Sequence, residues 1–193
     1  MILSAKDLAF AQEEEGAAPD LNNFPRSGTL IVHNSEGVIR NPSWFNICVN
    51  GGGGWSNGLH QLTMDMLWYI DPNAGIEGAS PDAVYNALAA EPWQYNADSS
   101  EMTVKLSQGI MWIDGVEFTA DDVVYTVQNQ VETPGMTWSG AFSTQVAEVT
   151  APDPYTVHFK LQNLNSRFHA IFSVRWNAAW IMPEHVFEKS RTC

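Results

Sequence analysis

The chain has 193 residues, of which 45% are hydrophobic and 16% are charged. This length and hydrophobic content are sufficient for one substantial core or two small ones, and they exclude a wholly disordered chain. Its 22 acidic residues outnumber the nine lysines and arginines, giving a net charge of −13 at pH 7. This charge argues against binding to nucleic acid or to anionic lipid, because both need a basic surface. The sequence also lacks a run of about 18 apolar residues, the length that predicts a membrane-spanning helix.

Residues 1–27 are predicted to be a flexible N-terminal segment or the remnant of a secretory signal. Residues 9–11 (Ala-Phe-Ala) have the small-x-small pattern of a cleavage site. Residues 1–8, however, contain Lys6 and Asp7 and have no apolar core. We therefore expect that no intact signal peptide is present in this sequence.

Residues 28–193 are predicted to form the folded part, beginning with a strand over residues 29–33. A loop over residues 34–58 follows, to which four consecutive glycines give unusual freedom. Residues 59–69 are expected to be helical, because one helical face would carry Leu59, Leu62, Met66 and Tyr69. Residues 84–90 fit either a short strand or a helix.

The middle of the chain has the clearest local pattern. Apolar and polar residues alternate from Met102 to Ser107, which predicts a half-buried strand. Asp114-Gly115 indicates a tight turn, and Thr119 with Asp122 three positions later is typical of a helix N-terminus. The helix is expected over residues 120–131, with one apolar face formed by Val123, Val124, Val127 and Val131.

After this helix, Thr133-Pro134-Gly135 predicts a break. Residues 146–150 and 155–161 then fit a hairpin around a Pro-Asp-Pro turn. Residues 165–180 are expected to be partly helical, and a final helix should begin within residues 182–185. The two cysteines, Cys48 and Cys193, are expected to be unpaired thiols.

One stretch resembles the signature of the family 5 extracellular solute-binding proteins, the receptors of bacterial ABC importers. It reads Leu106-x-x-Gly109-x-x-Trp112-x-Asp114-Gly115-x-x-Phe118-Thr119-Ala120-Asp121-Asp122-Val123. The resemblance implies a mixed α/β fold, the first lobe of a two-lobed clamshell that closes over its ligand. It also implies a periplasmic or extracellular location, delivery of ligand to a membrane permease, and no cofactor.

Within the family, the resemblance is closest to members that bind cello-oligosaccharides. The segments that support this likeness are residues 58–62, 67–71 and 165–177. The chain also contains eight tryptophans, and flat indole rings stack on the C–H faces of sugars. Because tryptophan-rich sites also occur in peptide binders, a peptide-binding receptor remains the alternative.

Candidate ligand-binding residues combine stacking rings with hydrogen-bonding side chains. A guanidinium, an indole and an amide stand side by side at residues 175–177, and an amide can both donate to and accept from hydroxyl groups. Loops are also the usual place for binding residues. The predicted set is Trp55, Asn57, Trp138, Arg175, Trp176, Asn177 and Trp180, with His60 as a further polar contact, whereas Trp68 and Trp112 are expected to be core residues.

Two other classes of function are compatible with the composition. A secreted carbohydrate-active enzyme could use a pair among Asp114, Glu117, Asp121 and Asp122, but turn and cap roles already account for Asp114 and Asp122. We therefore expect a protein that is not an enzyme, and the five histidines lack zinc-site spacing. A structural module that uses its tryptophans for assembly is the third possibility.

The resemblance ends at a point where family members continue into their second lobe. The final residues, Glu188-Lys-Ser-Arg-Thr-Cys193, differ from the acidic continuation that the family suggests. We expect a truncated or frame-shifted product that lacks the second lobe. Exposed apolar surface, and self-association to cover it, would follow.

Overall fold

The computed structural model of the protein describes residues 64–70, 84–173 and 178–190. All of them belong to one compact unit within residues 34–193. The predicted strand at 29–33, the loop at 34–58, both cysteines and the first half of the predicted helix at 59–69 lie outside the described residues.

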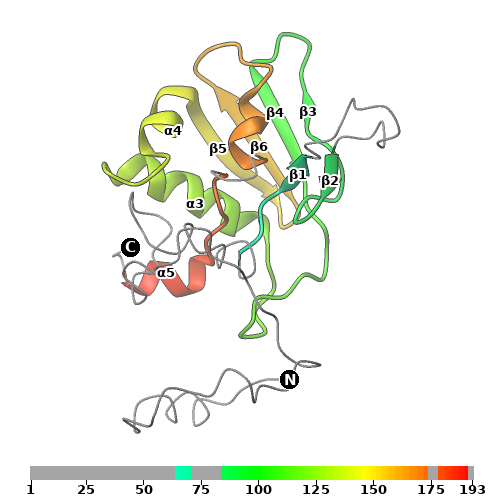
Figure 1. The fold of residues 1–193 in the computed structure, drawn as a ribbon, viewed down its shortest axis with the longest axis vertical. Coiled ribbons are helices and arrows are strands. Elements are labelled where there is room, and N and C mark those ends of the chain that lie inside the picture. The colour runs from blue at the N-terminus through cyan, green and yellow to red at the C-terminus, as the bar shows by residue number, and fades with distance from the viewer. Residues whose placement is uncertain (1–63, 71–83, 174–177, 191–193) are drawn as a thin grey trace, which may run out of the picture. The chain divides into compact units, whose positions relative to one another are not determined.

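Two antiparallel sheets and a set of short helices make up a mixed α/β fold (Figure 1). The smaller sheet pairs β1 (Trp68–Ile70) with β2 (Val84–Asn86). The larger sheet has the order β3-β4-β6-β5, formed by β3 (Gln94–Tyr95), β4 (Glu101–Lys105), β6 (Thr156–Leu161) and β5 (Val146–Asp153). The helices are α3 (Ala120–Glu132), α4 (Ser139–Gln145), the 3₁₀ helix η2 (Phe168–Phe172) and α5 (Glu184–Ser190).

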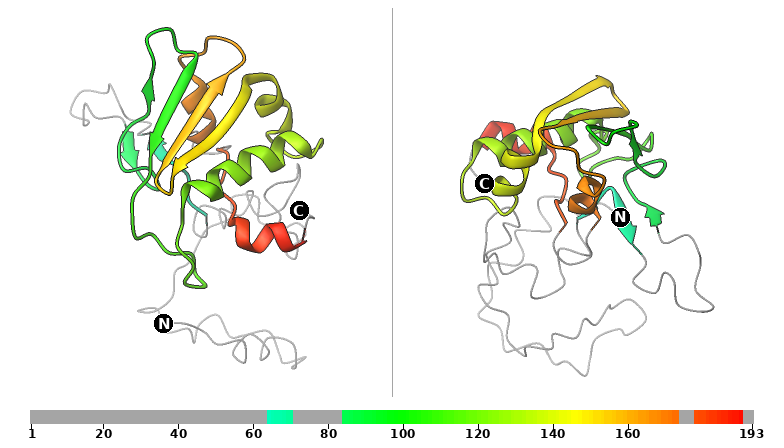
Figure 2. Two further views of the ribbon diagram at one scale, coloured as in Figure 1. Left: turned by 180° about the vertical axis from the view of Figure 1, so that it is seen from behind. Right: turned by 90° about the horizontal axis from the view of Figure 1, so that it is seen from above.

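The larger sheet has one buried face and one polar face. Met102 and Val104 on β4 alternate with Thr103 and Lys105, and Met102 pairs with Phe159 on β6. Helix α3 contacts β5 and β6, and the helices lie on one side of the sheet (Figure 2). An antiparallel sheet covered on one side only gives this alternation of apolar and polar residues.

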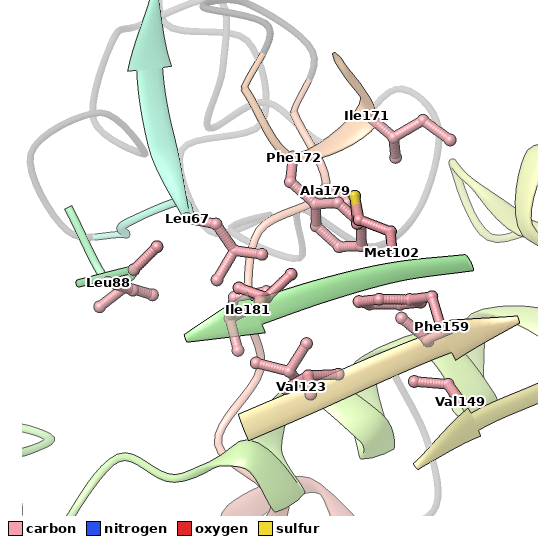
Figure 3. Packing of buried hydrophobic residues seen from close by; sticks show 14 of the residues in the cluster. Leu67, Leu88, Met102, Val123, Val149, Phe159, Ile171, Phe172, Ala179 and Ile181 are labelled. Atoms are coloured by element: carbon pink, nitrogen blue, oxygen red, sulfur yellow. The ribbon is translucent and has the colours of Figure 1, made fainter. Parts of the chain in front are cut away.

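The core joins the sheet to segments from distant parts of the sequence. Leu67, Val123 and Ile181 approach the sheet from three separate segments (Figure 3). Aromatic rings from η2 also belong to this core. The ring centroids of Phe168 and Phe172 lie 5.3 and 5.6 Å from the ring centroid of Phe159 on β6. Burial of such a cluster is the main favourable term in folding.

Most local predictions for the described residues are confirmed. The strand at β4, the turn at Gly115 (φ +86°), the helix at α3, the end of that helix at Thr133, the β5–β6 hairpin and the last helix occur where expected. Residues 165–180 contain the 3₁₀ helix η2, which agrees with a partly helical segment. The ambiguous residues 84–90 begin with strand β2.

Two predictions are wrong. Within residues 64–69 the chain is not helical but extended into strand β1, because the backbone of Trp68 and Tyr69 pairs with β2 rather than with its own next turn. Val131, which the sequence predicts on the apolar face of α3, is 37% exposed. That face instead continues through two buried polar side chains, Thr126 and Gln130.

Asp122 is a buried carboxylate, 4% exposed, at the start of α3. Its Oδ2 accepts hydrogen bonds from the backbone N–H of Thr119 at 3.0 Å and from the indole Nε1–H of Trp112 at 3.2 Å. Its Oδ1 accepts the backbone N–H of Glu184 at 2.8 Å, 62 residues away in the sequence. One side chain therefore caps α3, orients Trp112 and fixes the start of α5.

Thr126, one turn further along α3, makes a second link to the same distant segment. Its hydroxyl donates to the carbonyl of Asp122 at 2.7 Å and accepts the backbone N–H of Met182 at 2.8 Å. Both residues are buried, so each bond satisfies a backbone group that water cannot reach. Two side chains of α3 thus hold the backbone of residues 182–184.

The turn glycine Gly115 can be tested against a matched control. Gly115→Ala should lower the free energy of unfolding by about 1 kcal/mol, because an L side chain is strained at its φ of +86°. Gly140→Ala should instead stabilise the protein by about 0.5 kcal/mol, since Gly140 lies in helix α4 with open space around its Cβ position. Urea unfolding of both variants measures the difference, and equal effects would contradict the assigned turn.

Removal of the Asp122 carboxylate should be far more costly. Asp122→Ala leaves three donors without a partner and should destabilise the protein by roughly 3 kcal/mol or more, with Asp122→Asn intermediate. The control is Asp121→Asn, an exposed neighbour in the same helical turn, for which we expect a change below about 1 kcal/mol. Equal midpoints for the two Asn variants in thermal unfolding would refute the role assigned to Asp122.

Candidate functional site

Five of the seven predicted ligand residues lie outside the described residues: Trp55, Asn57, Arg175, Trp176 and Asn177. The same is true of His60. Their roles stay predictions. The other two, Trp138 and Trp180, can be placed.

Trp138 begins helix α4 as its N-cap residue. It is half-buried and packs against the main core. Its backbone N–H donates to Oε1 of Gln130, a buried side chain of α3, at 3.0 Å. Part of its surface therefore serves to hold α4 against α3, and the rest is available to solvent.

Trp180 lies in a small apolar cluster separate from the main core. It is 9% exposed and shares this cluster with buried Met66 and Ala178. Half-buried Met64 and Tyr69 border it. The structure therefore places Trp138 and Trp180 in different clusters.

Tyr69, at the border of the Trp180 cluster, donates its hydroxyl to Oδ1 of Asp65 at 2.9 Å. Burial, together with this hydrogen bond and the negative charge of Asp65, raises the pKa of Tyr69 to about 12. The hydroxyl therefore keeps its proton at neutral pH. The result is a hydrogen-bonded carboxylate–phenol pair, with Asp65 exposed and Tyr69 half-buried beside apolar side chains.

The two tryptophans expected in the core are confirmed to different degrees. Trp68 is fully buried, and its Nε1–H donates to the carbonyl of Glu91 at 2.9 Å. Trp112 is half-buried, with its ring edge-on to Phe118 at 5.9 Å and its Nε1–H on Asp122. Trp112, the tryptophan of the family-like signature, therefore has a structural role at the start of α3.

An aromatic cluster that sequence reasoning missed joins β3 to η2. The ring of His169 stacks on Trp93 with centroids 3.6 Å apart and planes 7° apart. Trp93 also meets Trp68 edge-on at 5.2 Å, and Tyr95 bonds to His169. In the sequence, the two aromatic residues Trp93 and Tyr95, two positions apart, indicate that this segment could form an aromatic contact. They do not identify its partner, because His169 on η2 is 74 residues from Tyr95.

Three of the four acidic residues that are candidates for catalysis have structural partners. Asp114 is 2.7 Å from Nε2 of His185, and this hydrogen bond lowers the pKa of the Asp114 carboxyl. Oε1 of Glu117 accepts the hydroxyl of Tyr155 at 2.7 Å, and Asp122 caps α3. Asp121 is exposed in the first helical turn.

Burial and the negative charges of Asp121 and Glu188 raise the pKa of Glu184, at the start of α5. These acids do not form a metal centre: the described part of the chain holds no group of three or more His, Cys, Asp or Glu side chains placed to bind a metal ion. None of the helices within residues 64–70, 84–173 and 178–190 has the length and apolar content needed to cross a membrane.

Comparison with known proteins identifies the scaffold. Residues 83–185, more than half of the chain, match the model of the bacterial extracellular solute-binding proteins, family 5. The periplasmic alpha-galactoside-binding protein of Rhizobium meliloti (strain 1021) is 25% identical over 151 residues, which cover 76% of this chain and 21% of that protein.

Solved structures share the fold. A dipeptide-binding protein from Pseudoalteromonas sp. SM9913, in complex with Met-Leu, matches with a TM-score of 0.63 and 21% identity over 80% of this chain and 32% of its own. A mannohexaose-bound periplasmic oligopeptide-binding protein from Thermotoga maritima matches with a TM-score of 0.54 and 24% identity over 66% of this chain and 21% of its own.

This chain therefore spans between a fifth and a third of the length of these relatives. On the match to residues 83–185, the chain belongs to the bacterial extracellular solute-binding proteins, family 5.

Proposed function

We propose that this protein is the substrate-binding component of an ABC importer and that it captures oligosaccharides of the cello-oligosaccharide type. The match of residues 83–185 to the family model is the observation on which the receptor function rests. The finer choice of a sugar rests on the sequence itself, in particular its eight tryptophans and the Arg-Trp-Asn triplet. Relatives named for an alpha-galactoside and bound to mannohexaose are consistent with this choice.

In this proposal the ligand residues make two kinds of contact with the sugar, stacking and hydrogen bonding. Trp55, Trp138, Trp176 and Trp180 supply apolar faces against the C–H surfaces of the sugar rings. Asn57, Arg175 and Asn177 supply donors and acceptors for its hydroxyl groups. Of the two indoles that can be placed, Trp138 has more surface open to solvent and is the better stacking platform.

The described scaffold supports this function by fixing the backbone on the C-terminal side of residues 175–177. The N–H of Ala179 donates to the carbonyl of Ile171 at 2.7 Å, and α3 holds Met182 and Glu184 through Thr126 and Asp122. A binding site whose backbone is already ordered loses less conformational entropy when the ligand binds. We infer that α3 is a positioning element for the site.

The remaining features follow from the receptor role. We infer a periplasmic or extracellular location, delivery of the ligand to a membrane permease, and no catalytic activity. The named relatives are binding proteins. A peptide-binding receptor is the second candidate, favoured by the neighbour that holds Met-Leu. Self-association stays a prediction, which sedimentation of the purified chain would test.

Ligand binding should raise the melting temperature by mass action. At a concentration of 100 times Kd the gain is about 2.7 kcal/mol, which corresponds to roughly 5–10 °C for a chain of this size. Cello-oligosaccharides should produce this shift, whereas xylo- and manno-oligosaccharides and di- and tripeptides should produce smaller ones. Trp176→Ala and Arg175→Ala should reduce it, and the exposed Arg167→Ala serves as the matched control.

A shift with peptides but none with sugars would assign the chain to the peptide binders. The absence of any shift across the panel would contradict the receptor function for this chain. Hydrolysis of a chromogenic glycoside by the purified protein, abolished in Asp114→Asn or Asp121→Asn, would favour the enzyme class instead.

A further inference from the structure

The short edge strand β3 is joined to η2 by side chains rather than by backbone pairing. The imidazole of His169 lies flat on Trp93, and its Nδ1 is 3.2 Å from the hydroxyl of Tyr95. The backbone N–H of His169 donates to the same hydroxyl at 3.0 Å. Trp93, Tyr95 and His169 therefore form one contact, named here the β3–η2 contact.

The hydrogen bonds of this contact suit a neutral imidazole whose Nδ1 accepts. The Tyr95 hydroxyl accepts from the His169 backbone N–H, and its own proton can be donated to Nδ1 when that nitrogen is unprotonated. Burial raises the pKa of Tyr95, although the bond from the His169 backbone opposes the shift, so this proton stays in place. If Nδ1 gained a proton, it could no longer accept from Tyr95, and the hydroxyl would have to turn its own proton away from this contact.

The electrostatic surroundings also disfavour an imidazolium. The ring is half-buried, and the charged neighbour that acts on it is Arg167, at the start of η2. From β3 the titratable group facing it is Tyr95. In the described part of the chain, the histidines that form ion pairs with a carboxylate are His158 and His185. Stacking on Trp93 would favour a cation. Burial and the positive charge of Arg167 act in the opposite direction and lower the pKa of His169 to about 4.

We propose that the β3–η2 contact is an acid-sensitive latch, in which protonation of His169 at Nδ1 releases the edge strand β3 from η2. Release would uncover Trp93 and one side of Trp68, while β4, β6 and β5 remain paired through their own backbone bonds. The inference does not depend on the identity of the ligand. It makes this end of the sheet responsive to acidity outside the cell.

The sign of the pH effect follows from the lowered pKa of His169. Above about pH 6.5, the usual value for histidine, both folded and unfolded states are neutral and the contact contributes its full stability. As the pH falls from 6.5 toward 4, His169 becomes protonated in the unfolded state but stays neutral in the folded state. The stability that the contact contributes is therefore progressively lost. Below about pH 4, His169 is protonated in the folded state as well.

Carboxylates also titrate near pH 4, so the test must resolve single residues. Two-dimensional NMR of the imidazole Cε1–H groups in the intact chain should give His169 a midpoint at least 1.5 pH units below 6.5. Across this midpoint, the protection factor of the His169 backbone N–H, which is the intrinsic exchange rate at each pH divided by the observed rate, should fall by tenfold or more. The protection factors at Val104 and Val157, whose strands form the β4–β6 pair, should stay unchanged.

Two variants and one control complete the experiment. Tyr95→Phe removes the donor to neutral Nδ1 and should raise the His169 midpoint by 0.5 units or more. His169→Phe keeps an aromatic ring on Trp93 and should abolish the pH-dependent exchange near residue 169, whereas His158→Gln, on the polar sheet face, should leave it intact. A His169 midpoint near 6.5, or simultaneous loss of protection at Val104, would overturn the latch.

Discussion

The buried carboxylate of Asp122 is the interaction on which much of this architecture depends. Removing a charge from water is costly, and here the cost is offset by three donors: two backbone N–H groups and one indole. Two of those donors are local, while the third belongs to Glu184 at the far end of the matched segment. The position of α5 relative to α3 is therefore specified by hydrogen bonds with defined geometry and not by apolar packing alone.

This arrangement explains which parts of the fold could be predicted from sequence. The turn at Gly115, the cap at Thr119 and the alternation along β4 depend on neighbouring residues, and local patterns report them well. Strand β1 and the burial of Thr126 and Gln130 depend on partners far along the chain: β2, Met182 and Trp138. A helical periodicity around Met66 was therefore misleading, because tertiary pairing overrides local preference.

The ligand residues are harder to predict from sequence for a related reason. Side-chain chemistry alone does not distinguish them, because tryptophan serves both in cores and in sugar sites. Burial separates the two roles for Trp68, which is fully enclosed, and leaves Trp138 with part of its surface open. The stacked pair Trp93 and His169 escaped prediction altogether, since an isolated histidine after a phenylalanine has no pattern that would reveal its partner.

The outer strand β5 has a further consequence for how the protein behaves at high concentration. Its pairing with β6 is irregular at two places, between Val146 and Glu148 and between Thr150 and Asp153, and Pro152 lies within the second. A regular, flat strand at this edge would offer a continuous row of donors and acceptors to the same strand of another molecule. Irregular spacing and a residue without an N–H interrupt that row, so β5 protects the molecule against edge-to-edge aggregation.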